Sequence, residues 1–130
     1  MLPAQTEPAG LRVVVAPTNP ITAAHMGMLL EMDGHHVLLA QDESSALEAV
    51  ASHDPDVLLM DRGLPGTGGH DFAKRLRSRN AVKSPLLIEM GGPDAAWRRP
   101  ADTGIDLHLA KPIEPSFLRG LLRRFQRVVG

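Results

Sequence analysis

The sequence predicts a doubly wound α/β domain, in which helices cover both faces of a five-stranded parallel β-sheet. Short apolar runs alternate along the chain with segments whose apolar residues recur every three or four positions. The length of 130 residues suits one compact domain, and 43% of the residues are hydrophobic, which is enough for a core. We expect this domain over residues 11–130, after a flexible segment of Pro, Gly and polar residues over residues 1–10.

Five apolar runs predict the strands. Each has about five or six residues, the usual length of a strand in a globular domain. The predicted strands are Arg12–Ala16, His36–Ala40, Asp56–Met60, Pro85–Met90 and Asp106–Ala110. The helical segments between them are the crossover connections that parallel strands require.

The first helix has well-marked ends. Asn19 can cap it, Pro20 fits the first helical position, and Gly34 ends it. The residues expected on its apolar face are Ile21, Ala24, His25, Met28, Leu29 and Met32.

Two further helices follow. One is predicted from Ser45 to about Ser52, opening with a capping box of Ser45 and Glu48. The next covers about His70–Arg79, and its inward residues are Phe72, Ala73 and Leu76.

The last helix has the clearest apolar period, whereas the helix before it is expected to be short and irregular. Pro100 interrupts the segment between Gly91 and Gly104, which leaves room for an irregular turn at about Asp94–Arg99. The apolar residues of the last helix are Phe117, Leu118, Leu121, Leu122, Phe125, Val128 and Val129. Its arginines point elsewhere: Arg119, Arg123, Arg124 and Arg127.

Composition excludes several kinds of site. The chain has no cysteine, which excludes disulfides and thiolate metal sites, and its six histidines are not spaced as zinc ligands. No apolar run is long enough to cross a membrane, and MLPAQTEPAG lacks the regions of a secretion signal. We expect a cytoplasmic protein with no membrane partner.

Charge is divided along the chain. The net charge is −1, but Met1 to Asp61 holds nine acidic residues and one basic residue, Arg12, which gives −8. From Arg62 to Gly130 there are thirteen basic and six acidic residues, which gives +7. The fold is expected to turn this division into an electric dipole.

The carboxyl ends of parallel strands meet at one edge of a sheet, where α/β proteins place functional residues. Here those ends carry Ala16-Pro17-Thr18, Asp61, Met90-Gly91 and Ala110-Lys111. An acid ends one strand, while a proline and a threonine follow the first strand.

The stretches PDVLLMDRGLPGTGG and LHLAKP resemble the receiver domains of bacterial two-component signalling, and the resemblance extends from Leu11 to the end of the chain. It implies a flavodoxin-like receiver fold with strand order 2-1-3-4-5. It also implies that Asp61 matches the phosphoacceptor and that Lys111 matches the lysine that contacts the phosphoryl group. Pro65 and Gly69 match the turn after the phosphoacceptor.

Four positions depart from the pattern of that family. Pro17 and Thr18 stand where receivers carry the two acids that hold magnesium, so no metal is expected; Asp61 and the carbonyl of Gly63 remain. The hydroxyl and aromatic residues that move on activation fall on Gly91 and His108. We expect Asp61 and Lys111 to form a constitutive pair, since no second carboxylate repels Asp61.

Glu89 is a candidate compensating acid. It lies two residues before Gly91 and therefore on the same face of the strand. Either it reaches solvent, or it enters the vacated space and pairs with Lys111 or His108, because buried acids require partners.

Three functions are considered. The first is a degenerate receiver that binds a signalling protein independently of phosphorylation and is not an enzyme. The second is a working phospho-receiver, in which Asp61 accepts a phosphoryl group from a histidine kinase and Thr18, Asn19 or Glu89 supplies metal ligands. The third, a flavin or nucleotide site, is disfavoured because PTNPIT has no glycine and the chain has one Trp and no Tyr.

The basic half of the chain predicts a partner surface on the fourth helix, fifth strand and fifth helix. Trp and Arg are the residue types most often found to anchor interfaces. The candidates are Trp97, Arg98, Arg99, Arg119, Arg123, Arg124 and Arg127. An acidic protein or head-to-tail self-association is expected there, and nucleic acid is the weaker alternative because the net charge is near zero.

Overall fold

The structure is a computed structural model, and it describes residues 10–64, 66, 69–79, 84–92 and 104–129. It contains a five-stranded parallel sheet in the order β2-β1-β3-β4-β5, which confirms the predicted fold class and strand order. The strands are β1 Arg12–Ala16, β2 His36–Leu39, β3 Val57–Asp61, β4 Leu86–Gly91 and β5 Leu107–Ala110. Their ends lie within one residue of the predicted ends.

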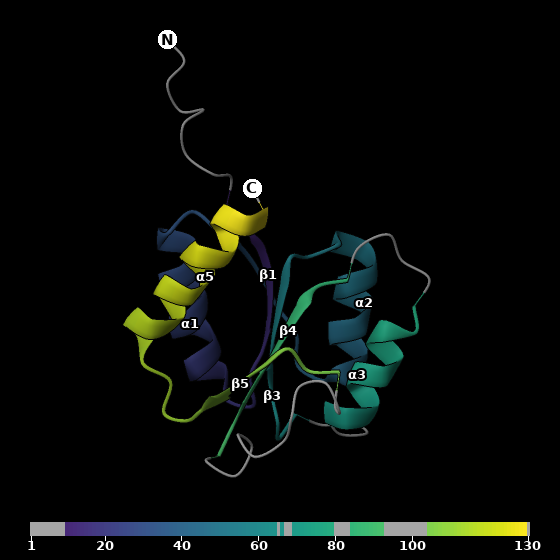
Figure 1. Cartoon of the computed structure of the whole chain (residues 1–130). Coiled ribbons are helices and arrows are strands. Elements are labelled where there is room, and N and C mark those ends of the chain that lie inside the picture. Colours follow the sequence, from purple (N-terminus) through teal and green to yellow (C-terminus); the bar gives the residue numbers. More distant parts are fainter. Residues whose placement is uncertain (1–9, 65, 67–68, 80–83, 93–103, 130) are drawn as a thin grey trace.

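Helices cover both faces of the sheet, with α1 and α5 on one face and α2 and α3 on the other (Figure 1). Their bounds are α1 Pro20–Met32, α2 Glu43–His53, α3 Gly69–Arg77 and α5 Pro115–Val129. None of the described helices is long and apolar enough to span a bilayer. The irregular turn predicted at Asp94–Arg99 and the flexible segment predicted before residue 10 lie outside the described residues.

The sheet has one apolar core on each face, because successive residues of a strand point to opposite faces. Val14, Leu58 and Leu87 pack against α2 and α3, whereas Val15 and Ile88 pack against α1 and α5. Every residue of β3 is buried, as is typical of a central strand in a doubly wound sheet. This burial sets the environment of Asp61, the last residue of β3.

The predicted inward face of α1 is wrong. Its buried residues are Ala23, Gly27 and Leu30, while Ile21 and Met28 are 69% and 59% exposed. Apolar residues surround this helix, so their spacing does not select one face. The buried side instead carries two small residues and Leu30, and Gly27 faces β2, since a Cβ atom there would lie 3.6 Å from Val37 Cγ1.

The start of α2 also differs from the prediction. The helix begins at Glu43, and its capping box joins Asp42 and Ser45 rather than Ser45 and Glu48. Asp42 Oδ1 accepts from the Ser45 N–H at 2.7 Å, and Ser45 Oγ accepts from the Asp42 N–H at 3.1 Å. At α1 the predicted cap is confirmed, since Asn19 Oδ1 accepts from the Ile21 N–H at 2.8 Å.

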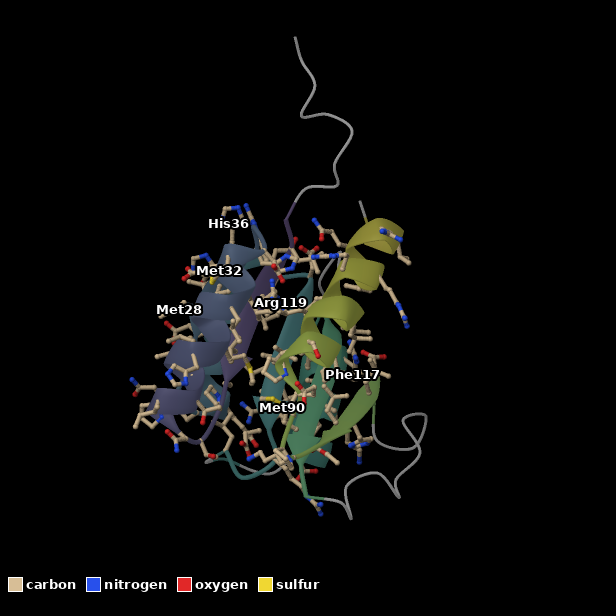
Figure 2. All side chains as sticks on the ribbon, turned by 90° about the vertical axis from the view of Figure 1, so that its left-hand side faces the viewer. Met28, Met32, His36, Met90, Phe117 and Arg119 are labelled. Carbon is tan, nitrogen blue, oxygen red and sulfur yellow. The ribbon has the colours of Figure 1, made fainter. Side chains whose placement is uncertain are left out.

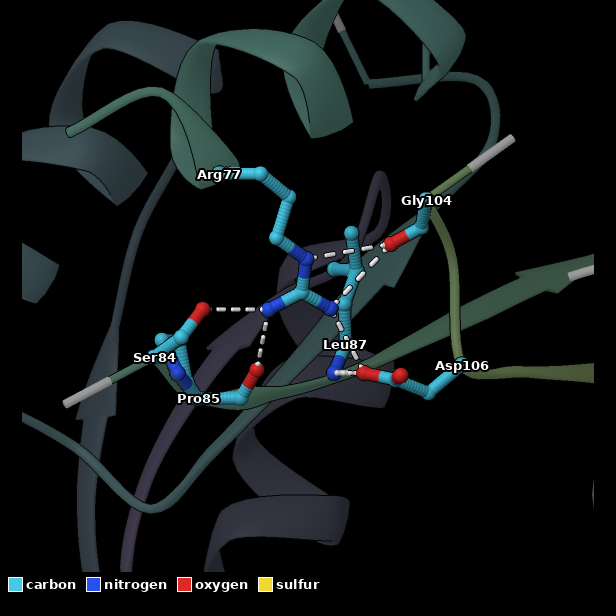
Figure 3. A network of polar contacts seen from close by, with 6 residues as sticks. All are labelled: Arg77, Ser84, Pro85, Leu87, Gly104 and Asp106. Carbon is cyan, nitrogen blue, oxygen red and sulfur yellow. Dashed lines mark hydrogen bonds and ion pairs between the residues drawn. The ribbon is translucent and has the colours of Figure 1, made fainter. Parts of the chain in front are cut away.

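Arg77, in the last turn of α3, ties together the ends of β4 and β5 (Figure 3). Its guanidinium donates to the carbonyls of Gly104 (3.2 and 3.1 Å) and Pro85 (2.9 Å), and to the Ser84 hydroxyl. It also donates to Asp106 Oδ2 at 2.6 Å, and the same oxygen accepts from the Leu87 N–H at 2.8 Å. All five N–H donors of an arginine are thereby used.

Replacement of Arg77 by Met is expected to lower the free energy of unfolding by about 2–3 kcal/mol, because the carbonyls and Asp106 lose a shared charged donor. Arg77→Lys should recover little of this loss, since one ammonium group cannot serve acceptors on three sides. Arg75→Met, on the exposed side of the same turn, is the control and should change stability by less than about 0.5 kcal/mol. Urea unfolding measures all three; equal midpoints for Arg77→Met and Arg75→Met would contradict this role.

Candidate functional site

Three polar residues meet where the strands end at their carboxyl edge. Asp61 ends β3, Thr18 follows β1, and Lys111 follows β5. Together with apolar residues they line an open cleft of about 600 Å³. The apolar lining residues are Pro17, Met26, Met90, Pro112 and Ile113. A hollow of about 710 Å³ lies at the opposite edge, beside Arg12 and His53, away from these strand ends.

The Asp61 carboxylate is almost fully buried, at 5% exposure, and both of its oxygens have donors. Oδ2 contacts the Lys111 ammonium and accepts from the Thr18 hydroxyl at 3.2 Å. Oδ1 accepts from the Gly63 N–H at 2.8 Å. The predicted contact between Asp61 and Lys111 is therefore present, and two donors from the chain complete it.

These donors determine the charge state of Asp61. Burial by itself raises the pKa of this carboxyl, but hydrogen bonds from Lys111 and Gly63, the charge of Lys111 and the bond from Thr18 together lower the pKa below its usual value. Asp61 is therefore ionised at neutral pH. Because the folded pKa is lowered, this stabilisation is complete above the unfolded pKa and is lost as the pH falls through the folded pKa.

Thr18 has a role that sequence reasoning did not find. Thr18 stands where receivers carry an acid and was expected at most to be a substitute metal ligand, whereas its hydroxyl donates to Asp61. Gly63 was considered for its carbonyl, yet its N–H makes the contact. Gly63 lies beside Thr18, since a Cβ atom at Gly63 would be 3.4 Å from Thr18 Cγ2. The sequence signal for this bond was a hydroxyl residue after β1, because β1 pairs with β3, the strand that ends in Asp61.

Glu89 lies against His108 and not against Lys111. The two residues are register partners on β4 and β5, and His108 Nδ1 is 3.0 Å from Glu89 Oε1. Their side chains are only 5% and 6% exposed. The oxygen lies outside the direction of the ring N–H, so the contact is close without being an aligned hydrogen bond, and His108 Nε2 has no partner among the described residues. Gly91 ends β4 and has no side chain to offer the site. Its backbone carbonyl accepts from the Lys111 N–H at 2.7 Å.

Of the arginines predicted to form a partner surface, Arg119 already has a partner within the chain. Arg119 makes two hydrogen bonds to Asp33, at 2.8 and 2.7 Å, and so faces the end of α1. This bond and charge lower the pKa of Asp33 and raise that of Arg119. Arg123 also acts on Asp33 through its charge, although its side chain is exposed, as is that of Arg127. Trp97, Arg98 and Arg99 lie outside the described residues.

Comparison with known proteins decides the family. The family model for the response regulator receiver domain matches residues 13–123. The chain belongs to this family. It is 36% identical over 118 residues to the probable transcriptional regulatory protein TcrX of Mycobacterium tuberculosis, and 36% identical over 104 residues to a gliding motility regulatory protein of Myxococcus xanthus. These matches cover 86% and 78% of this chain, but only 50% and 13% of those proteins, so the chain spans half or less of their length.

Solved receiver structures share the fold. A CheY-like receiver domain from Methylobacillus flagellatus has a TM-score of 0.79 at 24% identity, over 89% of this chain and 98% of that one. The receiver domain of the sensor histidine kinase PA1611 from Pseudomonas aeruginosa, described with a magnesium ion in its active-site cleft, has a TM-score of 0.76 at 23% identity, over 92% and 99% of the two chains. At these identities the likeness shows the fold alone.

The donors at this receiver site fit magnesium poorly. Magnesium prefers hard oxygen ligands, usually one or two carboxylates with water or phosphate. Asp61 is the one acid among the described residues that line the cleft, and Lys111 contacts its Oδ2. Among the described residues, no three His, Asp or Glu side chains are grouped to hold a metal ion. A cation would have to displace Lys111 or share Asp61 with it.

Removal of Lys111 is expected to leave Asp61 buried with two neutral donors. Lys111→Met should therefore lower the free energy of unfolding by about 1 kcal/mol, a modest value because the lysine side chain is 45% exposed. Asp61→Asn should cost a similar amount, and the double variant should cost less than the sum of the two single changes. Lys74→Met, on the exposed side of α3, is the control for loss of one positive charge. Urea midpoints of the four variants measure the coupling; strictly additive losses would show that the pair contributes nothing.

Proposed function

We propose that this receiver domain is a binding module for signalling proteins whose state is not set by phosphorylation of Asp61. The observation that supports this proposal is the set of donors around Asp61: Lys111, Thr18 and Gly63 already neutralise and hydrogen-bond the carboxylate. In an intact receiver, a metal ion held by two acids neutralises the carboxylate. Pro17 and Thr18 stand at the positions of those two acids here. The module is not an enzyme, and we place it in the cytoplasm.

Phosphoryl transfer explains why the missing acids matter. The reaction depends on positioning and on neutralising charge that develops on the phosphoryl oxygens, and metal ions bridge those oxygens. Lys111 supplies one positive charge, but this charge already contacts Asp61, the one carboxylate among the described residues that line the cleft. Asp61 would have to lose its partner before it could react. The proposal therefore treats Asp61 as a structural acid.

The alternative is a working phospho-receiver in which Asp61 accepts a phosphoryl group from a histidine kinase. The presence of Asp61 and Lys111 at matching positions favours it. It requires substitute metal ligands, and two of the three candidates have other contacts. Asn19 Oδ1 caps α1 by accepting from the Ile21 N–H, and Glu89 lies against His108. Only Thr18 lies beside Asp61, and a hydroxyl binds magnesium more weakly than a carboxylate.

The proposed partner is an acidic signalling protein, or a second copy of the chain, bound at the basic end of the molecule. Arg123, Arg124 and Arg127 are exposed on α5 and support this choice by their charge. Nucleic acid remains the weaker candidate because the net charge of the chain is −1.

Incubation with a small phosphodonor and magnesium, followed by intact mass measurement, tests the proposal. We expect the wild-type mass to stay unchanged. The variant Pro17→Asp/Thr18→Asp restores the two acids and is expected to gain one phosphoryl group in a magnesium-dependent manner, which shows that the donor is competent. A phosphoryl adduct on the wild-type chain that disappears in Asp61→Asn would establish the phospho-receiver alternative.

A further inference from the structure

Large apolar side chains are exposed at two separate places on the described surface. Five of them lie on α1 and β2, and two lie on α5. They are Ile21, Met28, Met32, Leu38 and Leu39 in the first group, and Phe117 and Val128 in the second. Figure 2 shows Met28 and Met32 on the outer side of α1 and Phe117 on the far side of α5, with Arg119 between the two helices. Exposed apolar groups of this size often mark interaction sites.

Four residues of the first group form one surface, which we call the edge surface: Ile21, Met28, Met32 and Leu39. Leu38 precedes Leu39 on β2 and so points to the other face of the sheet. Ile21, Met28 and Met32 are spaced by seven and four residues and therefore lie along one side of α1, where they are 69%, 59% and 72% exposed. Leu39 is 56% exposed on the outermost strand of the sheet. It lies beside α1, because a Cβ atom at Gly27 would be 4.0 Å from Leu39 Cδ2.

The second group belongs to a stripe on α5, which we call the α5 stripe: Phe117, Leu121, Arg124 and Val128. Its members are spaced by four, three and four residues, so they share one side of the helix. Phe117 and Val128 are 56% and 81% exposed. Arg119 lies on the opposite side of the helix, where it bonds Asp33 at the end of α1. The α5 stripe therefore faces away from α1.

The two surfaces have opposite charges around them. α1 holds neither Lys nor Arg, and its one acid, Glu31, is exposed. By contrast, the 15 residues of α5 include four arginines and neither Asp nor Glu. Contact between two α1 helices would bring acids together, and contact between two α5 helices would bring arginines together. Only α1 against α5 pairs opposite charges.

Their shapes also agree. Residues spaced by three, four and seven positions are those with which two helices pack along a shared seam. The 13 residues of α1 and the 15 residues of α5 give helices of about 20 and 22 Å, from a rise of about 1.5 Å per residue. A stripe on one helix can thus lie along nearly the whole length of the other.

We propose that the edge surface of one copy of this chain binds the α5 stripe of a second copy, head to tail. The inference rests on the proposed role as a binding module, and it names the partner surface that this role leaves open. After the first contact forms, one copy keeps an unused α5 stripe and the other keeps an unused edge surface. Such a contact therefore extends to longer assemblies as the concentration rises. Salt should weaken it, since charge selects the pairing.

Sedimentation velocity over a concentration series tests this contact with two variants on exposed positions. Met28→Lys/Met32→Lys reverses the charge of the edge surface, and Phe117→Ser/Arg124→Glu disables the α5 stripe. We expect the wild-type chain to associate at low salt and each variant alone to associate at least about tenfold more weakly. An equimolar mixture of the two variants should form a dimer that grows no further, because each partner retains one intact surface. Arg75→Glu, on exposed α3, is the control and should associate like the wild type.

Three results would overturn the inference. A wild-type chain that stays monomeric at every concentration shows that the proposed contact does not form. An edge-surface variant that still dimerises alone shows a symmetric contact through α5. A mixture of the two variants that stays monomeric, while both retain wild-type urea midpoints, shows that the surfaces do not bind each other. Intact mass after phosphodonor treatment of the same samples reports on the proposed function separately.

Discussion

A buried carboxylate needs charged and hydrogen-bonding partners, and Asp61 finds three of them within the chain. Its position follows from β3, which is buried on both faces and so carries its last residue into a desolvated site. Leaving such a charge unpaired is costly, whereas one cation and two neutral donors offset much of the cost. Because Lys111, Thr18 and Gly63 come from different segments, this one carboxylate holds together the carboxyl ends of β1, β3 and β5.

The same strand β5 is tied to its neighbours at two further levels. At its amino end, Asp106 accepts from the Leu87 N–H and from Arg77. In its middle, His108 lies against Glu89, its register partner on β4. With Lys111 at the carboxyl end, polar contacts run along the whole strand. Side chains of the chain itself therefore hold β5 in place along its whole length.

The sequence predicts the sheet well because short apolar runs bounded by Pro, Gly and Asp have few other structures open to them. It predicts the buried face of α1 poorly because apolar residues surround that helix, and a glycine on the buried side adds nothing to the apolar period. The Asp61–Lys111 contact follows from two strand ends at one edge. The Arg77 network does not, since its acceptors near Ser84 and Asp106 are brought together only by the finished fold.

The pKa of Asp61, followed by carbon NMR of its carboxyl group with and without millimolar magnesium, tests most directly whether the chain neutralises this acid by itself. The account predicts a pKa below the usual value of about 3.9 for aspartic acid in peptides, unchanged by magnesium. A pKa at or above that value would show that Lys111 and Thr18 do not hold the ionised form. A pKa that magnesium lowers further would show that the cleft still binds the metal, and either result would contradict the account.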